Sequence, residues 1–127
     1  MYKVIAVSVL LGVFLAACGS YATPPEDFLS ARVQFADPEL AKKSITVAGF
    51  VDFVRGLKSG DQETRILGWV AKGESWTLVS ESAGEKYEYR FADVMTDRGG
   101  KQVVVLHDIY RDGKSQDKTT LLNLIIK

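Results

Sequence analysis

The stretch of residues 75–91, SWTLVSESAGEKYEYRF, decides the fold of this 127-residue chain. Its second half alternates aromatic with charged side chains, the period-2 pattern of a strand that buries one face. Its first half alternates in the same way, with Trp76 and Leu78 on one face. The Ala83-Gly84-Glu85 stretch between the halves favours a turn. We therefore predict a β-hairpin whose second strand presents one aromatic face, made of Tyr87, Tyr89 and Phe91.

Outward from this hairpin, strand-like segments continue to alternate with turn residues. Residues 65–71 predict a strand before the hairpin, and the valine-rich residues 102–110 predict one after it. Residues 119–126 are expected to form the last strand. Glycine-containing turns at 72–74, 97–100 and 112–114 separate these segments. This spacing is typical of an antiparallel sheet, here of about five or six strands.

The segment of residues 45–57 fits two structures. Ile45, Val47, Val51 and Phe53 would share one face of a strand. Val47, Val51 and residues 54 and 57 would instead share one face of a helix, and a short apolar run does not decide between the two periods. Gly49 and the β-branched residues favour a strand here.

Helix-start signals occur only nearer the N-terminus. Pro25-Glu26-Asp27 and Asp37-Pro38-Glu39 each combine a proline suited to the first turn with acidic residues that favour the positive end of a helix. The sequence thus predicts an α+β fold, with a short N-terminal helical segment packed on the antiparallel sheet. A small all-β barrel is the alternative.

The first eighteen residues, MYKVIAVSVLLGVFLAAC, have a different character. Lys3 supplies a positive start, residues 4–17 are uncharged and mostly apolar, and small residues come before Cys18. This is the layout of a secretory signal. The run is shorter than the roughly 20 residues of a membrane-spanning helix, and Gly-Ser follows it rather than a basic cluster. We expect residues 1–17 to be removed as a signal peptide.

Leu15-Ala16-Ala17-Cys18 resembles the lipobox of bacterial lipoproteins. The resemblance implies that the Cys18 thiol receives a diacylglyceryl group, that cleavage follows Ala17, and that the new amino terminus is acylated. It also implies a location in the cell envelope. Because Gly19 is not the aspartate that retains enteric lipoproteins at the inner membrane, the expected site is the outer membrane, facing the periplasm. Residues 18–26 are then the lipidated terminus and tether, and residues 27–127 a single globular domain.

Composition excludes several function classes. The chain has 16 basic and 16 acidic residues, so loss of Lys3 with the signal leaves a net charge near −1 and no basic stripe for a nucleic acid. Once Cys18 is lipidated, no thiol remains for a disulfide, a nucleophile or a zinc site. We therefore expect no cofactor and no metal.

Nor does the sequence present a catalytic motif. His107, the only histidine, is expected to be structural or half-exposed, because its neighbour Asp108 would point to the opposite face of a strand. The carboxylates are scattered along the sequence, and we interpret them as side chains on solvated strand faces. We predict no catalytic residue.

Aromatic residues on three successive predicted strands are the remaining candidates for a site. If paired strands bring them together, they could grip an envelope protein or a glycan, although the same residues could equally form the core. The candidate binding residues are Trp69, Trp76, Tyr87 and Tyr89. The sequence thus predicts a membrane-anchored lipoprotein with a non-enzymatic binding role. The alternative is a periplasmic hydrolase that acts through acidic residues, which requires two carboxylates in one pocket or an acid beside His107.

Overall fold

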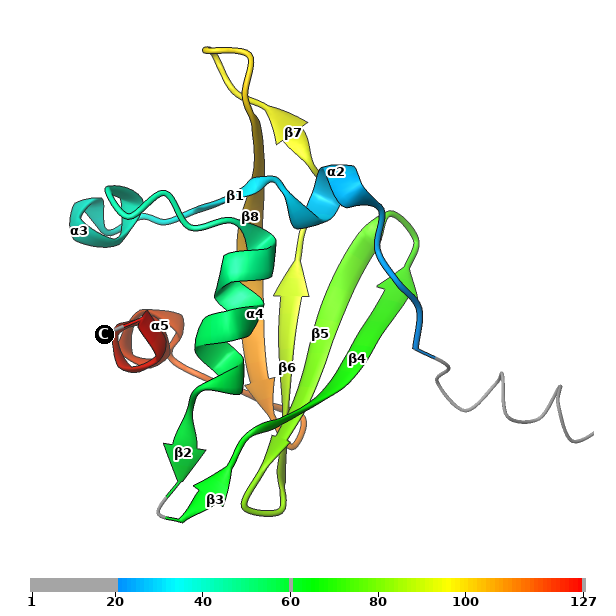
Figure 1. The fold of residues 1–127 in the computed structure, drawn as a ribbon, viewed down its shortest axis with the longest axis vertical. Coiled ribbons are helices and arrows are strands. Elements are labelled where there is room, and N and C mark those ends of the chain that lie inside the picture. The colour runs from blue at the N-terminus through cyan, green and yellow to red at the C-terminus, as the bar shows by residue number, and fades with distance from the viewer. Residues whose placement is uncertain (1–20, 60, 127) are drawn as a thin grey trace, which may run out of the picture.

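A computed structural model describes residues 21–59 and 61–126 (Figure 1). The described helices are α2 (Glu26–Leu29), α3 (Pro38–Ala41), α4 (Val47–Arg55) and α5 (Lys118–Ile126). The main strands are β1 (Arg32–Gln34), β4 (Arg65–Lys72), β5 (Ser75–Ser82), β6 (Glu85–Phe91) and β8 (Gln102–Arg111). Shorter ones are β2 (Lys58–Ser59), β3 (Gln62–Glu63), β7 (Met95–Thr96) and β9 (Lys114–Ser115). The fold is α+β, as the sequence predicted.

The predicted hairpin is the centre of the sheet. Strands β5 and β6 pair antiparallel, with Leu78 opposite Tyr89 and Ser82 opposite Glu85. The two residues between them, Ala83 and Gly84, have φ values of 52° and 81°. Positive φ at both positions of a two-residue loop is the type I′ turn, whose twist matches that of the flanking strands. The local sequence therefore fixes both the hairpin and its register.

The sheet is mixed rather than purely antiparallel. Among the described residues its order is β1-β8-β6-β5-β4, with β7 and β9 also pairing with β8. Strand β1 runs parallel to β8, with Val33 opposite Val104. The strand order ends at β1 and β4 and does not close, so the barrel alternative does not describe this sheet.

The preference for a strand over residues 45–57 was wrong, because α4 occupies most of this segment. Thr46 accepts a hydrogen bond from the Gly49 amide at 3.1 Å and caps the helix. The helix buries four apolar residues at helical spacing: Val47, Phe50, Val51 and Val54. Burial of this stripe against the sheet outweighs the strand propensity of the valines, since tertiary packing overrides a weak local preference.

The expectation of a last strand over residues 119–126 was also wrong, because this segment is helix α5. Asp117 precedes it, and its carboxylate accepts a hydrogen bond from the Thr120 hydroxyl at 3.0 Å. The helix buries Leu122, Ile125 and Ile126, which recur at intervals of three and four. A second helix thus lies beside α4 at the β8 side of the sheet (Figure 1).

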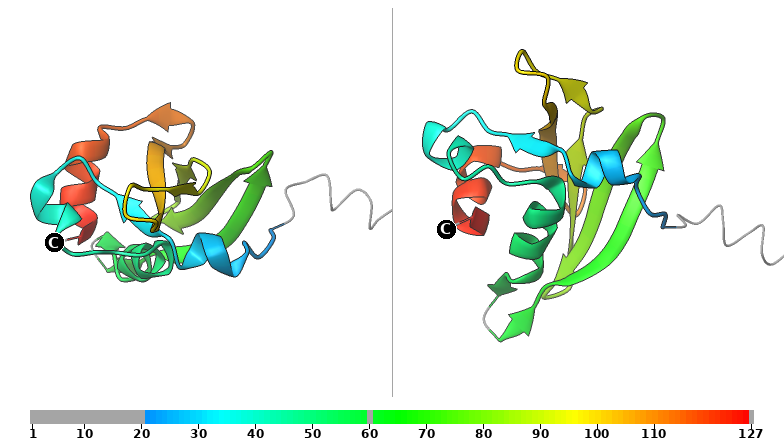
Figure 2. Two further views of the ribbon diagram at one scale, coloured as in Figure 1. Left: turned by 90° about the horizontal axis from the view of Figure 1, so that it is seen from above. Right: turned by 45° about the horizontal axis from the view of Figure 1, so that its top comes forward.

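Aromatic contacts join the helices to the sheet. Helices α2 and α4 lie over the same face of the sheet (Figure 2). Phe28 of α2 meets Trp69 edge-on at 5.3 Å and Phe91 at 5.8 Å between ring centroids. Phe50 of α4 meets Tyr89 at 5.5 Å and Phe91 at 5.7 Å. One continuous aromatic cluster therefore forms the centre of the core.

The described part of the expected tether packs against the sheet. The Ala22 amide donates to the Trp69 carbonyl at 2.9 Å, and Pro24 is buried. The Tyr21 ring lies where a Cβ on Gly68 would be, only 2.6 Å from the nearest ring atom, and Gly68 has a φ of 146°. This glycine is needed both for its backbone conformation and for the close approach of Tyr21. Residues 21 and 22 of the expected tether therefore contact β4.

Removal of the α4 cap should weaken the fold measurably. Thr46→Ala deletes the acceptor for the Gly49 amide, and we expect the free energy of unfolding to fall by about 1 kcal/mol in urea denaturation. Thr46→Ser keeps the hydroxyl and should retain most of that stability. Equal losses in both variants would show that the methyl group, rather than the cap, is responsible.

Candidate functional site

The four aromatic residues predicted to bind a partner do not form one exposed patch. Trp69 and Tyr89 are buried, with exposed fractions of 9% and 2%, and both belong to the core. Trp76 is half-buried and contacts Phe28 at 6.2 Å between ring centroids. Tyr87 is half-buried and stacks on Tyr89 at 6.4 Å. Of these four residues, only Trp76 and Tyr87 therefore keep part of their side chains at the surface.

Tyr87 and Tyr89 instead line a cavity of about 310 Å³ between helix α5 and the sheet, here called the α5 cavity. Its other lining residues are Leu57, Lys58, Thr64, Ser80, Ser82, Leu121, Leu124 and Ile125. Helix α5 contributes the apolar wall, and strands β5 and β6 contribute a wall of hydroxyl groups. Without α5, Leu57 would be the only aliphatic residue among those that line this cavity.

Two buried hydroxyl groups face the α5 cavity from the sheet. Ser80 is 1% exposed, and its Oγ has no hydrogen-bond partner among the described residues. Burial raises the pKa of Tyr89 to about 12, which the nearby Ser80 side chain partly offsets. The phenol is therefore neutral at physiological pH. Ser80 could have been found from the sequence, because it follows Trp76 and Leu78 at period 2 and so places a hydroxyl on the buried face.

A second group of polar residues lies on the opposite, helix-free face of the sheet. The register of β6 and β8 shifts between Arg90 and Phe91, which pair with Asp108 and Leu106, and leaves His107 as an extra residue. This bulge brings His107 Nδ1 to 2.9 Å from Asp108 Oδ2. The expectation that the two side chains point to opposite faces was therefore wrong, because a bulge interrupts the alternation.

The bulge places this pair in a shallow hollow of the sheet, here called the back-face hollow. Other residues that line it are Val70, Lys72, Ser75, Thr77, Glu88 and Arg90. The His107 side chain is 70% exposed, beyond the half-exposed position expected. An exposed imidazole beside a carboxylate can accept or donate protons, but nothing here excludes water from it.

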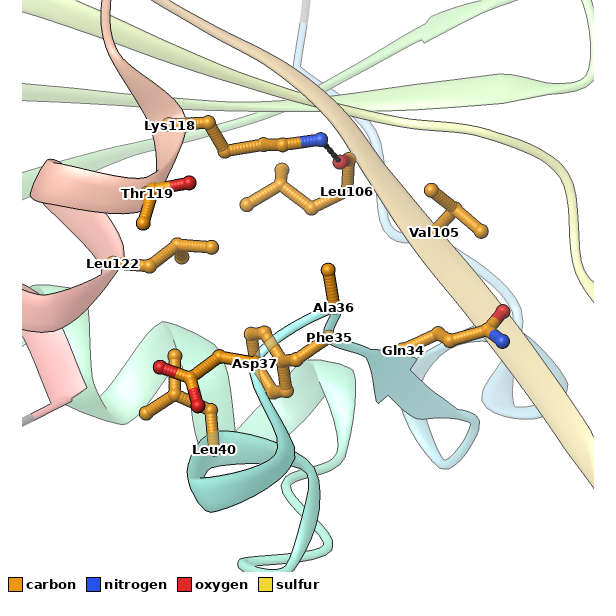
Figure 3. A pocket seen from close by; sticks show the side chains of 10 residues that line it. All are labelled: Gln34, Phe35, Ala36, Asp37, Leu40, Val105, Leu106, Lys118, Thr119 and Leu122. Atoms are coloured by element: carbon orange, nitrogen blue, oxygen red, sulfur yellow. Dashed lines mark hydrogen bonds between the residues drawn. The ribbon is translucent and has the colours of Figure 1, made fainter.

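A third pocket lies where β1 ends beside β8 (Figure 3). Lys118 Nζ donates to the backbone carbonyls of Leu106 at 2.9 Å and His107 at 3.3 Å. The ammonium thus satisfies the edge of β8 beyond the last residue paired with β1, Val105. Because backbone carbonyls already bind the Lys118 ammonium, we interpret this pocket as part of the packing that closes the edge of the sheet.

Cys18 lies outside the described residues, so its lipidation stays a prediction. Within residues 21–59 and 61–126, no group of three or more histidine, cysteine or acidic side chains has the arrangement of a metal site. None of the described helices combines the length and hydropathy needed to cross a bilayer.

Burial of Tyr89 gives the protein a specific alkaline sensitivity. The unfolded chain loses the phenol proton near pH 10, whereas the folded protein keeps it up to about pH 12. Stability should therefore fall between these pH values, by about 3 kcal/mol from this residue. We expect Tyr89→Phe to reduce the loss by that amount in denaturant titrations across the range. Equal pH dependence in both proteins would contradict the buried phenol.

No protein-family model, no curated protein and no solved structure matches this chain.

Proposed function

We propose that this protein is a lipoprotein of the bacterial cell envelope, anchored through Cys18, whose domain binds a ligand or partner without turning it over. The observation that carries the proposal is the lipobox-like Leu15-Ala16-Ala17-Cys18, placed just ahead of a folded domain. The first described residue, Tyr21, already packs against Gly68 of the sheet. Signal, lipidation site and fold therefore follow one another without a long linker.

This spacing sets where the domain would work. Tyr21 is the third residue after Cys18, and a chain spans at most about 3.5 Å per residue, so the anchor lies within about 11 Å of the fold. Each buried methylene contributes about 0.8 kcal/mol, so two or three acyl chains on one residue would hold the domain at the membrane. By the sorting resemblance at Gly19, that membrane is the outer membrane of a diderm host.

The arrangement favours binding over catalysis. A domain fixed at a surface meets its partners at high local concentration, so a modest intrinsic affinity is enough. The α5 cavity has the size and the mixture of apolar and polar walls that small-molecule sites use.

A hydrolase is the second candidate, favoured by one observation. The bulge in β8 supplies the acid beside His107 that this alternative requires, and Glu88 lines the same hollow. It ranks second because the imidazole is exposed on an open sheet face. Hydrolytic sites gain most from charge stabilisation where water is excluded.

The anchor is tested by metabolic labelling. Cells given an alkyne-tagged palmitate should label the wild-type protein, and Cys18→Ser should abolish the label and leave an uncleaved precursor. The conservative exchange keeps size and polarity and removes only the thiol that accepts the lipid. Fractionation of the labelled wild type should place it in the outer membrane. Equal labelling of the two proteins would refute lipidation at Cys18. Labelled protein confined to the inner membrane would refute the proposed outer-membrane location.

The choice between binding and hydrolysis is tested at His107. We expect His107→Ala to complement a deletion strain as well as the wild type does, because the imidazole is a surface group in this proposal. The melting temperature and palmitate labelling of the variant serve as controls for folding and anchoring. If a folded, labelled His107→Ala protein fails to complement, and Asp108→Asn fails likewise, the hydrolase takes the place of the binding protein.

A further inference from the structure

We infer that the α5 cavity is a binding site for a small neutral molecule with a hydrocarbon body and one hydroxyl or carbonyl oxygen. The oxygen of the ligand lies at Ser80, and its hydrocarbon lies against Leu121 and Ile125. This inference goes beyond the proposed function, because it assigns the chemistry of a ligand and does not depend on lipidation of Cys18.

The unpaired hydroxyl of Ser80 is the first support. A buried polar group without a hydrogen bond costs about 1 to 3 kcal/mol, and such groups are few in native proteins. Ser80 is 1% exposed, and its Oγ lacks a partner among the described residues. The Tyr89 phenol is near enough for the Ser80 hydroxyl to lower its pKa, but the two groups do not meet the distance and angle of a hydrogen bond. Ser80 lies on the wall of the α5 cavity, opposite Tyr87 in the β5–β6 pairing. A ligand oxygen in the cavity would supply the missing hydrogen bond.

The volume and the opposite wall decide what kind of molecule fits. One water, with about 30 Å³ of liquid volume, would fill only about a tenth of the 310 Å³ cavity and would leave the leucine and isoleucine wall uncovered. The volume also stands at the lower end of the range for ligand pockets, which begins at about 300 Å³. The cavity therefore suits a small molecule rather than a two-chain lipid.

The charges around the cavity favour a neutral ligand. Lys58 is the only charged side chain among the lining residues, and it is exposed at the rim. The deeper polar groups, Ser80 and Tyr89, are neutral hydroxyl groups. An ionised carboxylate beside them would lose its hydration without gaining a counter-ion, which is costly. A hydroxyl or carbonyl oxygen meets the same groups without that cost.

The inference is tested with octan-1-ol, octanoate and octane as probes. The melting temperature of the purified full-length protein is followed by tryptophan fluorescence at matched free probe concentrations. We expect octan-1-ol to raise the melting temperature of the wild type more than octane or octanoate does. Binding only the folded state stabilises that state by mass action. The octanol supplies the hydrogen bond that octane lacks and avoids the charge that octanoate carries.

Ser80→Ala is the decisive variant. It should melt at the same temperature as the wild type or higher without ligand, because it removes an unpaired buried hydroxyl. It should also bind octan-1-ol about tenfold more weakly, the factor expected for one lost hydrogen bond. Ser82→Ala, on the same strand and facing the same cavity but less buried, is the matched control and should retain most of the affinity.

Three outcomes would overturn the inference. One is a lower melting temperature for ligand-free Ser80→Ala, which would show that the hydroxyl is already paired. Another is equal octanol affinity in Ser80→Ala and the wild type. The third is a wild-type response to octanoate or octane as strong as that to octan-1-ol, or no response to any probe. None of these results depends on whether palmitate labels Cys18, so the anchor and the ligand site are tested separately.

Discussion

Coverage of one sheet face by the aromatic cluster is the constraint on which the rest of the structure depends. Phe28 and Phe50 come from helices, whereas Trp69 comes from β4 and both Tyr89 and Phe91 come from β6. Aromatic side chains bury 150–250 Å² each, and edge-to-face contacts add stability beyond the buried area. For a domain of about 110 residues without a disulfide in its folded part, this cluster is the main source of cohesion.

Burial of the aromatic cluster also separates the residues that stabilise the fold from those that stay accessible to a partner. Tryptophan and tyrosine are frequent at binding sites, but in this domain two of the four candidates are committed to the core. Helix α5 covers the sheet only in part, and the uncovered part of the buried face carries serine, threonine and tyrosine hydroxyls. The hydroxyl groups of the α5 cavity therefore lie at the margin of the core, where the apolar covering ends.

The sequence predicted the structure that depends on neighbouring residues. It did not predict the elements whose structure depends on packing against residues far away in the chain. The turn at Ala83-Gly84 depends only on the backbone conformations of these two residues, so the hairpin could be predicted from the sequence. Helix α4 could not, because valines at positions 47, 51 and 54 fit a strand or a helix until the sheet beneath them is known. In α5, apolar residues outnumber polar ones, which hides the helical period.

The candidate site residues also differ in whether the sequence alone could predict them. The pairing of His107 with Asp108 depends on a register shift between β6 and β8, and the sequence of one strand carries no record of its partner's register. Ser80 was readable as a hydroxyl on the buried face. That its Oγ lacks a partner depends on every group packed around it, so only the three-dimensional structure reveals it.

The contact of Ala22 with Trp69 has a consequence for the solubility of the protein. Strand β4 is an edge of the sheet, and an exposed edge strand offers unpaired amides and carbonyls to strands of other molecules. Ala22 occupies the middle of that edge, and Arg65 and Lys72 place charges at its two ends. The segment that connects the domain to Cys18 thus also blocks edge-to-edge aggregation. Its separation from β4 would leave the backbone groups of that edge open to strands of other molecules.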